Sequence, residues 1–289
     1  MPKGRRLIAA ALLGLLLACY TLARALEIIP TAVPGKAVVA VDVLSAMAFA
    51  LVDGGRHYRW SGILVFTLLC ALIGNATENL SVATGFPFGH YQFLELMGPK
   101  LFNVPVLLGL AYVGMAYVSW TVARIIVGNR SASISRSQIL TLPLVASFIM
   151  VAWDLAQDPV WGTILGAWKW RDGGPWFGVP VSNYFGWYLN VFLIYLAFAT
   201  CLRRLLPTTP GEHRPTLWPP VIFYAICATG NVLQVFARSA PEVEYDATGK
   251  LWRTADILAA SALVSIFAMG GFAAIAAVRL IECRAPVKG

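Results

Sequence analysis

The chain opens with a long apolar run, "LIAAALLGLLLACYTLARAL" at residues 7–26, in which Arg24 is the one charged residue. A transmembrane helix needs about 20 consecutive, mostly apolar residues to cross the hydrocarbon core of a bilayer. The preceding "MPKGRR" is basic, as in a secretory signal peptide, but "ALEIIP" at the end of the run is a poor cleavage site. We therefore expect residues 7–26 to form an uncleaved first transmembrane span.

The composition extends this interpretation to the whole chain. Of the 289 residues, 58 % are apolar and only 12 % are charged, and the mean hydropathy is +0.71. A soluble domain usually carries about 25 % charged residues. Further apolar runs follow at residues 36–53, 60–79, 103–127, 138–157, 183–203, 217–237 and 254–280. We predict an all-α, polytopic membrane bundle of eight spans in a single domain, residues 1–289. The run at 36–53 is short and contains Asp42, so seven spans remain the alternative.

The basic residues predict the orientation of the spans. The net charge is +8, but Lys and Arg lie in short loops between apolar runs, which favours an orienting role over nucleic-acid binding. Loops of one alternate set, including both chain ends, hold 14 of the 22 basic residues, and the other set holds 8. The richer set is expected to be cytoplasmic. We therefore expect a multi-pass protein of the cell membrane, with both termini cytoplasmic if there are eight spans.

Three carboxylates lie where apolar runs end. Glu78 ends the third run, and Asp154 and Asp158 end the fifth in "VAWDLAQDPVW". Acids at the edge of the hydrocarbon are candidates for function by default. The alternatives are that Glu78 marks the water interface, that Asp158 stops a helix before Pro159, and that Asp154 pairs with Arg or an amide.

The predicted topology places these three acids at the same membrane face. Asp154 and Asp158 are four residues apart and share one helix face. In a low dielectric both cannot ionise easily, so one is expected to keep a proton and to act as a general acid. Only His90 lies near them, and "DLAQD" is a poor match to a carboxylate metal motif. We expect no metal and no cofactor.

Tryptophan is concentrated beside the same acids. Six of the ten Trp lie within a short segment: Trp153, Trp161, Trp168, Trp170, Trp176 and Trp187. An interfacial aromatic belt explains such a cluster. The functional alternative is a wall of rings that stacks on a polyene and stabilises a carbocation.

Two segments resemble a known family. "ENLSVATGFPFGHYQFLELMGPKLFNVPV", which starts at Glu78, resembles the family's Glu, then Gly, then Pro-Phe-Gly-x-Tyr, then Gly-Pro and a closing Val-Pro. "WDLAQDPVWGTILGAWKWRDGGPWFGVPVSNYFGW", which starts at Trp153, resembles its Asp-Pro, Trp-x-Trp and Gly-Val-Pro-x-x-Asn-(Tyr/Phe)-x-Gly-Trp. This is the membrane carotenoid-biosynthesis family that includes the carotenoid 1,2-hydratases of the γ-carotene and bisanhydrobacterioruberin type. The motifs cover about residues 75–190.

The resemblance implies a hydro-lyase that adds water across the C1=C2 double bond of an acyclic ψ-end of a carotenoid. The expected partners are a carotenoid, water and the lipid bilayer, and association with other carotenoid enzymes is left open. Because the same protonation begins a cyclisation, an end-group cyclase stays an alternative. A membrane transporter is another, since intramembrane acids also serve proton coupling.

Hydration assigns expected roles to the candidate residues. Asp154 or Asp158 would protonate C2, and Glu78 would orient or deprotonate the water that adds to the tertiary C1 cation. The expected substrate-binding residues are those that line the cation site, Tyr91, Trp153 and Trp187, and those that hold water or tune a carboxylate, His90 and Asn183.

Overall fold

The computed structural model describes residues 3–29, 31–129, 133–205, 215–237 and 241–282. Five of the basic residues in the orientation argument lie outside the described residues: Arg130, Arg214, Arg238, Arg284 and Lys288. The side of the membrane that each end of the bundle faces therefore stays a prediction.

Helices form nearly the whole described structure. Their bounds are α1 Lys3–Leu26, α2 Gly35–Leu69, α3 Asn75–Thr84, α4 Val106–Ile126, α5 Gln138–Asp158, α6 Val181–Leu205, α7 Trp218–Leu233, α8 Thr254–Val264 and α9 Gly270–Glu282. Three π-helical segments continue or join them, η1 Cys70–Gly74, η3 Pro159–Ile164 and η5 Ser265–Met269, and two 3₁₀ turns are η2 Glu95–Met97 and η4 Gln234–Phe236. The predicted all-α polytopic fold is confirmed, since seven helices in the described part of the chain are long and apolar enough to cross a membrane.

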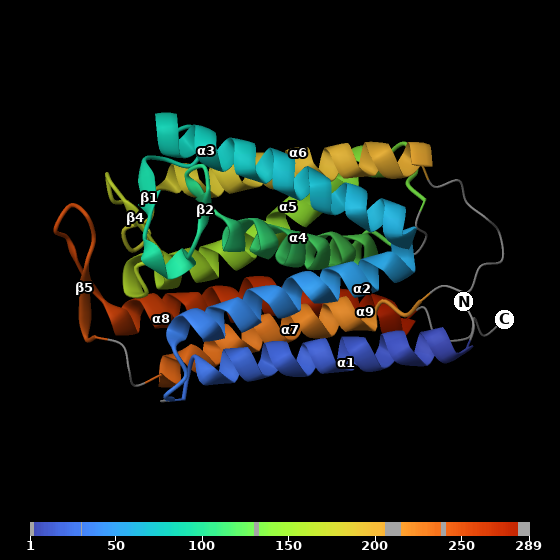
Figure 1. Cartoon of the computed structure of the whole chain (residues 1–289), viewed down its shortest axis with the longest axis horizontal. Helices are drawn as coiled ribbons and strands as arrows, with labels where there is room; N and C mark the ends of the chain where they lie inside the picture. The colour runs from blue at the N-terminus through green and yellow to red at the C-terminus, as the bar shows by residue number, and fades with distance from the viewer. Residues whose placement is uncertain (1–2, 30, 130–132, 206–214, 238–240, 283–289) are drawn as a thin grey trace.

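The longest of these seven helices shows whether the run at 36–53 is a separate span. Gly35–Thr84 contains 50 residues. At about 1.5 Å per residue it would extend roughly 75 Å, more than twice the thickness of the hydrocarbon core. Arg59 breaks it, with a non-helical φ of 60° and ψ of 168°, and the chain reverses direction there (Figure 1). The segments 35–58 and 60–84 are thus two antiparallel arms, as the runs at 36–53 and 60–79 predicted.

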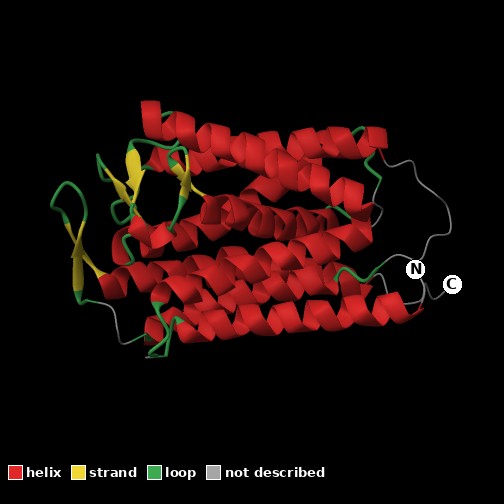
Figure 2. Ribbon diagram, in the orientation of Figure 1, coloured by secondary structure: helices red, strands yellow, loops and turns green. Residues whose placement is uncertain are grey.

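The bundle has two unlike ends. α1 begins and α9 ends at the same end of the bundle, as an even number of passes requires (Figure 1). The short strands gather at the other end (Figure 2). They form three antiparallel pairs: β1 Tyr91–Phe93 with β4 Trp168–Trp170, β2 Lys100–Leu101 with β3 Val104–Pro105, and β5 Val243–Tyr245 with β6 Leu251–Arg253.

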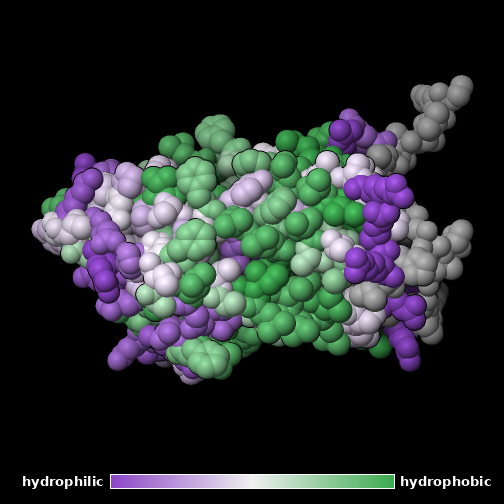
Figure 3. Space-filling view, turned by 90° about the horizontal axis from the view of Figure 1, so that it is seen from above, coloured by the Kyte–Doolittle hydropathy of each residue, from purple (hydrophilic) through white to green (hydrophobic). Residues whose placement is uncertain are grey.

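The surface matches the demands of a bilayer. On the face shown in Figure 3, apolar residues cover the middle of the molecule and hydrophilic residues gather toward both ends. The described chain is therefore that of a multi-pass membrane protein, whose apolar segments are helices and so pair their backbone groups within each segment.

The core is built around α4. This helix contacts α2, α5 and α9, and its middle residues Tyr117, Val118 and Trp120 are fully buried. Because α4 begins directly after the strand residue Pro105, its first turns lie at the end of the bundle that carries the β-strands. That position brings Leu108 and Tyr112 next to the ends of α3 and α5.

Candidate active site

The first part of the site is the turn after α3, which brings the chain back to Glu78. α3 ends at Gly85, which adopts the left-handed conformation that glycine tolerates (φ +81°), and its N–H donates to the Ser81 carbonyl at 2.7 Å. The buried Ser81 hydroxyl donates to the Gly89 carbonyl at 3.1 Å and fixes the turn. Tyr91 therefore comes back over α3, where its hydroxyl donates to Glu78.

Glu78 is held by two tyrosines. Its side chain is buried, with the residue only 3 % exposed. Tyr91 donates to one carboxylate oxygen, and Tyr112 of α4 donates to the other at 2.5 Å. The Tyr112 hydroxyl in turn accepts from the Nδ2 of Asn190 at 2.9 Å. Burial and the nearby Glu78 charge both raise the pKa of Tyr91, so this phenol stays protonated and remains a donor.

The two aspartates share one amide. Asn183 of α6 donates through Nδ2 to Asp154 at 3.1 Å and also to Asp158. Asp158 accepts a second bond, from the indole Nε1 of Trp168 at 2.6 Å. Both carboxyl groups are buried. Asp158 thus has two donors, whereas Asp154 has only its share of the Asn183 amide.

A two-stranded ribbon covers the carboxylates with aromatic rings. In the β1–β4 pair, Tyr91 lies opposite Trp170 and Phe93 lies opposite Trp168. The ring centroids of these pairs are 4.7 Å and 6.3 Å apart. Because alternate residues of a strand face the same side, one face of the ribbon presents all four rings to the bundle.

Gly162 of η3 makes room for this ribbon. A Cβ at this position would lie 2.9 Å from Nε1 of Trp168 and 3.6 Å from Oδ1 of Asp158. The π-helical segment begins at Pro159, directly after Asp158, and such segments are frequent at functional sites. The absence of a side chain at residue 162 is what lets the indole reach the carboxylate.

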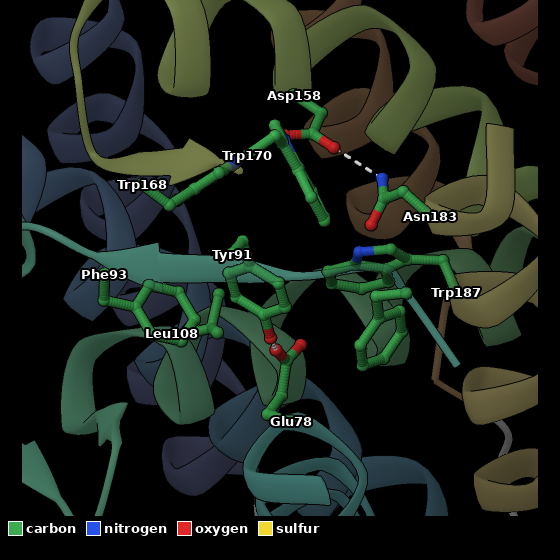
Figure 4. Close-up of a pocket in the computed structure, with 10 residues that line it drawn as sticks. Glu78, Tyr91, Phe93, Leu108, Asp158, Trp168, Trp170, Asn183 and Trp187 are labelled. Carbon is green, nitrogen blue, oxygen red and sulfur yellow. Dashed lines mark hydrogen bonds between the residues drawn. The ribbon is translucent and has the colours of Figure 1, made fainter. Parts of the chain in front are cut away.

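Two cavities meet at Asp158. The smaller has a volume of about 20 Å³ and includes Glu78, Tyr91, Asp158 and Asn183 in its lining (Figure 4). The larger has a volume of about 50 Å³ and is mainly apolar, with Trp153, Asp154 and Trp161 in its lining. A cavity of about 10–15 Å³ holds one water molecule. Four residues line both cavities and form the wall between them: Leu108, Asp158, Trp168 and Trp187.

The predicted tryptophans form part of this arrangement. Trp187 stacks on Tyr112, with the centroids 4.5 Å apart and the planes 8° apart. Trp153 meets the edge of Trp187 at 6.1 Å. The structure therefore brings together seven of the eight predicted site residues: Glu78, Tyr91, Trp153, Asp154, Asp158, Asn183 and Trp187.

His90 is the exception. Its side chain is 45 % exposed, and its Nδ1 lies 3.2 Å from Asp172 on the surface. Successive side chains of a strand point to opposite sides, so the residue before the inward-facing Tyr91 points outward. The structure does not place His90 over the acids, contrary to the expectation from the sequence.

Several residues of the site were not predicted from the sequence. Tyr112 and Asn190 complete the Glu78 network, and Trp168 and Trp170 belong to the covering ribbon. A signal existed for Asn190, which lies seven residues after Asn183 and hence on the same helix face. Among the described residues, no group of three or more His, Cys, Asp or Glu side chains is arranged to hold a metal ion.

The fold and the site together define a polytopic membrane protein with three acids buried beneath an aromatic cover. The family described as "Carotenoid biosynthesis protein" matches residues 35–247, which is more than half of the chain. The chain belongs to this carotenoid biosynthesis protein family, as the two sequence motifs indicated.

One curated relative is a bisanhydrobacterioruberin hydratase from Haloarcula japonica. It is 30 % identical to this chain over 174 residues, which are 58 % of this chain and 54 % of the relative. The chain thus matches about half the length of that curated relative. No solved structure matches the chain.

Proposed function

We propose that the protein adds water across the C1=C2 double bond of an acyclic ψ-end of a carotenoid. The observation that carries this proposal is that Asp158 and Trp187 line both a water-sized cavity, whose wall also includes Glu78, and a larger cavity that is mainly apolar. A hydration needs these two compartments side by side, because an alkene and one water molecule must meet at one carbon atom. The family and the name of the Haloarcula relative support the same reaction.

Asp154 is the acid in this proposal. It lines the apolar cavity, where the alkene would lie, and it does not line the smaller one. Hydrogen bonds from Trp168 and Asn183 stabilise the ionised form of Asp158, whereas Asp154 accepts only the shared Asn183 bond. When two close carboxyl groups hold one proton, the proton favours the group with fewer donors. Asp154 then donates this proton to C2.

The cation that results lies on the tertiary C1 atom. The faces of Trp153 and Trp187 can stabilise it, each by roughly 0.5–2 kcal/mol. Water in the smaller cavity attacks C1 and loses a proton to Glu78, which has lone pairs free beyond the two tyrosine bonds. One proton leaves Asp154 and one reaches Glu78, so the product differs from the substrate by one water, and exchange with solvent resets both groups.

The distribution of basic residues supports the proposed location, and the family supports the proposed partners. The protein acts in the cell membrane with both termini cytoplasmic, and the active site lies at the outer face. A polyene would lie between the helices with its end group at the acids. Association with other enzymes of carotenoid synthesis would supply the acyclic end and remove the product.

The test is expression in a lycopene-producing host followed by mass spectrometry of the pigments. We expect a product heavier by one water from the wild type, and none from Asp154→Asn or Glu78→Gln at equal amounts of inserted protein. His90→Ala is a matched control, because His90 lies in the same turn but outside both cavities. Normal hydration by both carboxyl variants would refute the assignment of the acids, and a product with the mass of the substrate would indicate a cyclase.

A further inference from the structure

The larger cavity is lined by further polar residues that the proposed hydration does not use. Besides Asp154 and Asp158, its lining includes Tyr20 of α1, Asp42 of α2 and Gln157 of α5. The Oδ1 atom of Asp42 is buried and has no hydrogen-bond partner among the described residues. A carboxylate at this depth of a membrane protein is costly and marks a functional site by default.

Gln157 supplies a second hydrogen-bond acceptor among the residues that line this cavity. The residue is 5 % exposed, and its Oε1 atom is buried without a hydrogen-bond partner among the described residues. Its Nε2 donates to Oδ1 of Asn231 at 2.8 Å, and Arg24 donates to the same oxygen at 2.5 Å. Asn231 uses its own Nδ2 on Ser265, at 3.0 Å.

This network fixes which way the Gln157 amide points. Since Oδ1 of Asn231 is an acceptor already engaged by the Arg24 guanidinium, the atom of Gln157 that faces it must be the NH₂ group. Arg24 is itself held by Glu27 at 2.7 Å. Oε1 is therefore the atom of Gln157 that has no hydrogen-bond partner among the described residues.

We propose that Asp42 and Gln157 form a binding subsite for a hydroxyl group on the isoprenoid end group that occupies the larger cavity. This inference rests on the proposed function only for the nature of that end group. Both residues line one cavity of about 50 Å³ that Asp154 also lines, so the hydroxyl and the reacting alkene belong to the same end of the substrate.

A hydroxyl group suits this subsite in either protonation state of Asp42. If Asp42 is ionised, both free atoms are acceptors and the ligand must bring a donor. If Asp42 is protonated, the hydroxyl oxygen accepts from it while the hydroxyl hydrogen goes to Oε1 of Gln157. A ketone or an ether has no donor and leaves Gln157 unpaired. The subsite therefore binds an end group with a hydroxyl more tightly than the same end group without one or with a carbonyl in its place.

The test measures binding without turnover. Purified full-length protein in detergent is titrated with geraniol and with 2,6-dimethylocta-2,6-diene, which has the same carbon skeleton without the hydroxyl, and the quenching of tryptophan fluorescence gives the two Kd values. We expect the wild type to bind the alcohol about tenfold more tightly, as a hydrogen bond to a buried charged or polar acceptor predicts. Asp42→Leu and Gln157→Met should each bring the ratio of Kd values to about one.

Met115→Leu is the matched control, because Met115 lines the same cavity without a polar group. It should alter both Kd values together and keep their ratio. Equal Kd values in the wild type, or a ratio that survives both polar substitutions, would overturn the subsite and show that these acceptors bind an ordered water only. The result is separable from the hydration test: Asp154→Asn should lose hydration and keep the ratio, and either outcome can fail without the other.

Discussion

The contact between Gly162 and Trp168 allows the role of Asp158 to be tested without altering any polar group. Alanine at residue 162 would place a Cβ 2.9 Å from Nε1 of Trp168, too close for any real contact. The indole cannot yield easily, because it stacks on Trp161 at 6.2 Å and meets Phe93 at 6.3 Å. We therefore expect Gly162→Ala to push Nε1 away from Asp158 and to break their 2.6 Å hydrogen bond.

The size of the effect follows from that bond. A hydrogen bond to a charged group contributes about 1.5–3 kcal/mol. Suppose that Asp158 holds the water and keeps the proton on Asp154. Loss of the hydrogen bond from Trp168 to Asp158 then raises the free-energy barrier of hydration by a similar amount, so that hydration is roughly 10- to 100-fold slower. The assay is the initial rate of product formation in membranes that contain equal amounts of each variant. Trp168→Phe removes the donor without adding a Cβ and should slow the reaction by a comparable factor.

Gly109→Ala is the matched control for this experiment. It makes the same chemical change on α4, where a Cβ would meet nothing within 4 Å. We expect it to hydrate at the wild-type rate. Equal rates for Gly162→Ala and Gly109→Ala would refute the reasoning, because Asp158 would then not depend on the position of the indole.

The other predictions concern stability and pH. Tyr112→Phe should lower the free energy of unfolding in detergent by about 2–4 kcal/mol, since Glu78 loses a donor and the Asn190 amide a buried acceptor; a loss under 1 kcal/mol would contradict the network. Ser81→Ala should cost about 1–3 kcal/mol by the same measurement, because it leaves turn backbone groups unpaired, and an unchanged midpoint would show that the turn does not need the hydroxyl. At the β5–β6 hairpin, burial alone would raise the pKa of Asp246, but hydrogen bonds from Thr248, Trp252 and Lys250 hold it below its usual value. The stabilisation is therefore present at neutral pH and is lost as the pH falls through this lowered value, so the fluorescence of Trp252 should change only in acid, and a change near neutral pH would contradict this.

Much of the fold could be predicted from the sequence because membrane spans are a local property. Apart from the short run at 36–53, each apolar run is long enough to cross the bilayer by itself, and the chain reversal at Arg59 falls between two of the predicted runs. The meeting of Glu78 with Asp154 and Asp158 was predictable for the same reason, since the order of spans alone fixes which helix ends lie at one face.

The covering ribbon could not be predicted in this way. β1 and β4 are three residues long, and they lie far apart in the chain. Their Trp, Tyr and Phe residues suit an interfacial belt as well as a strand, so composition does not separate the two. The pairing of Tyr91 with Trp170 is a tertiary contact, and with it comes the alternation that turns His90 outward.

The place of α1 in the structure bears on how this family can diversify. The family match begins at residue 35, after α1, and it includes all the carboxyl groups assigned to the reaction. Tyr20 and Arg24 belong to α1, yet Tyr20 lines the larger cavity and Arg24 holds the Asn231 side chain that orients Gln157. If Asp42 and Gln157 bind the end group as proposed, selectivity for it can change through α1, which contains none of the acids proposed to react. We expect exchange of residues 3–26 with the corresponding segment of a relative to alter the preference for the end group and to leave the proposed chemistry unchanged.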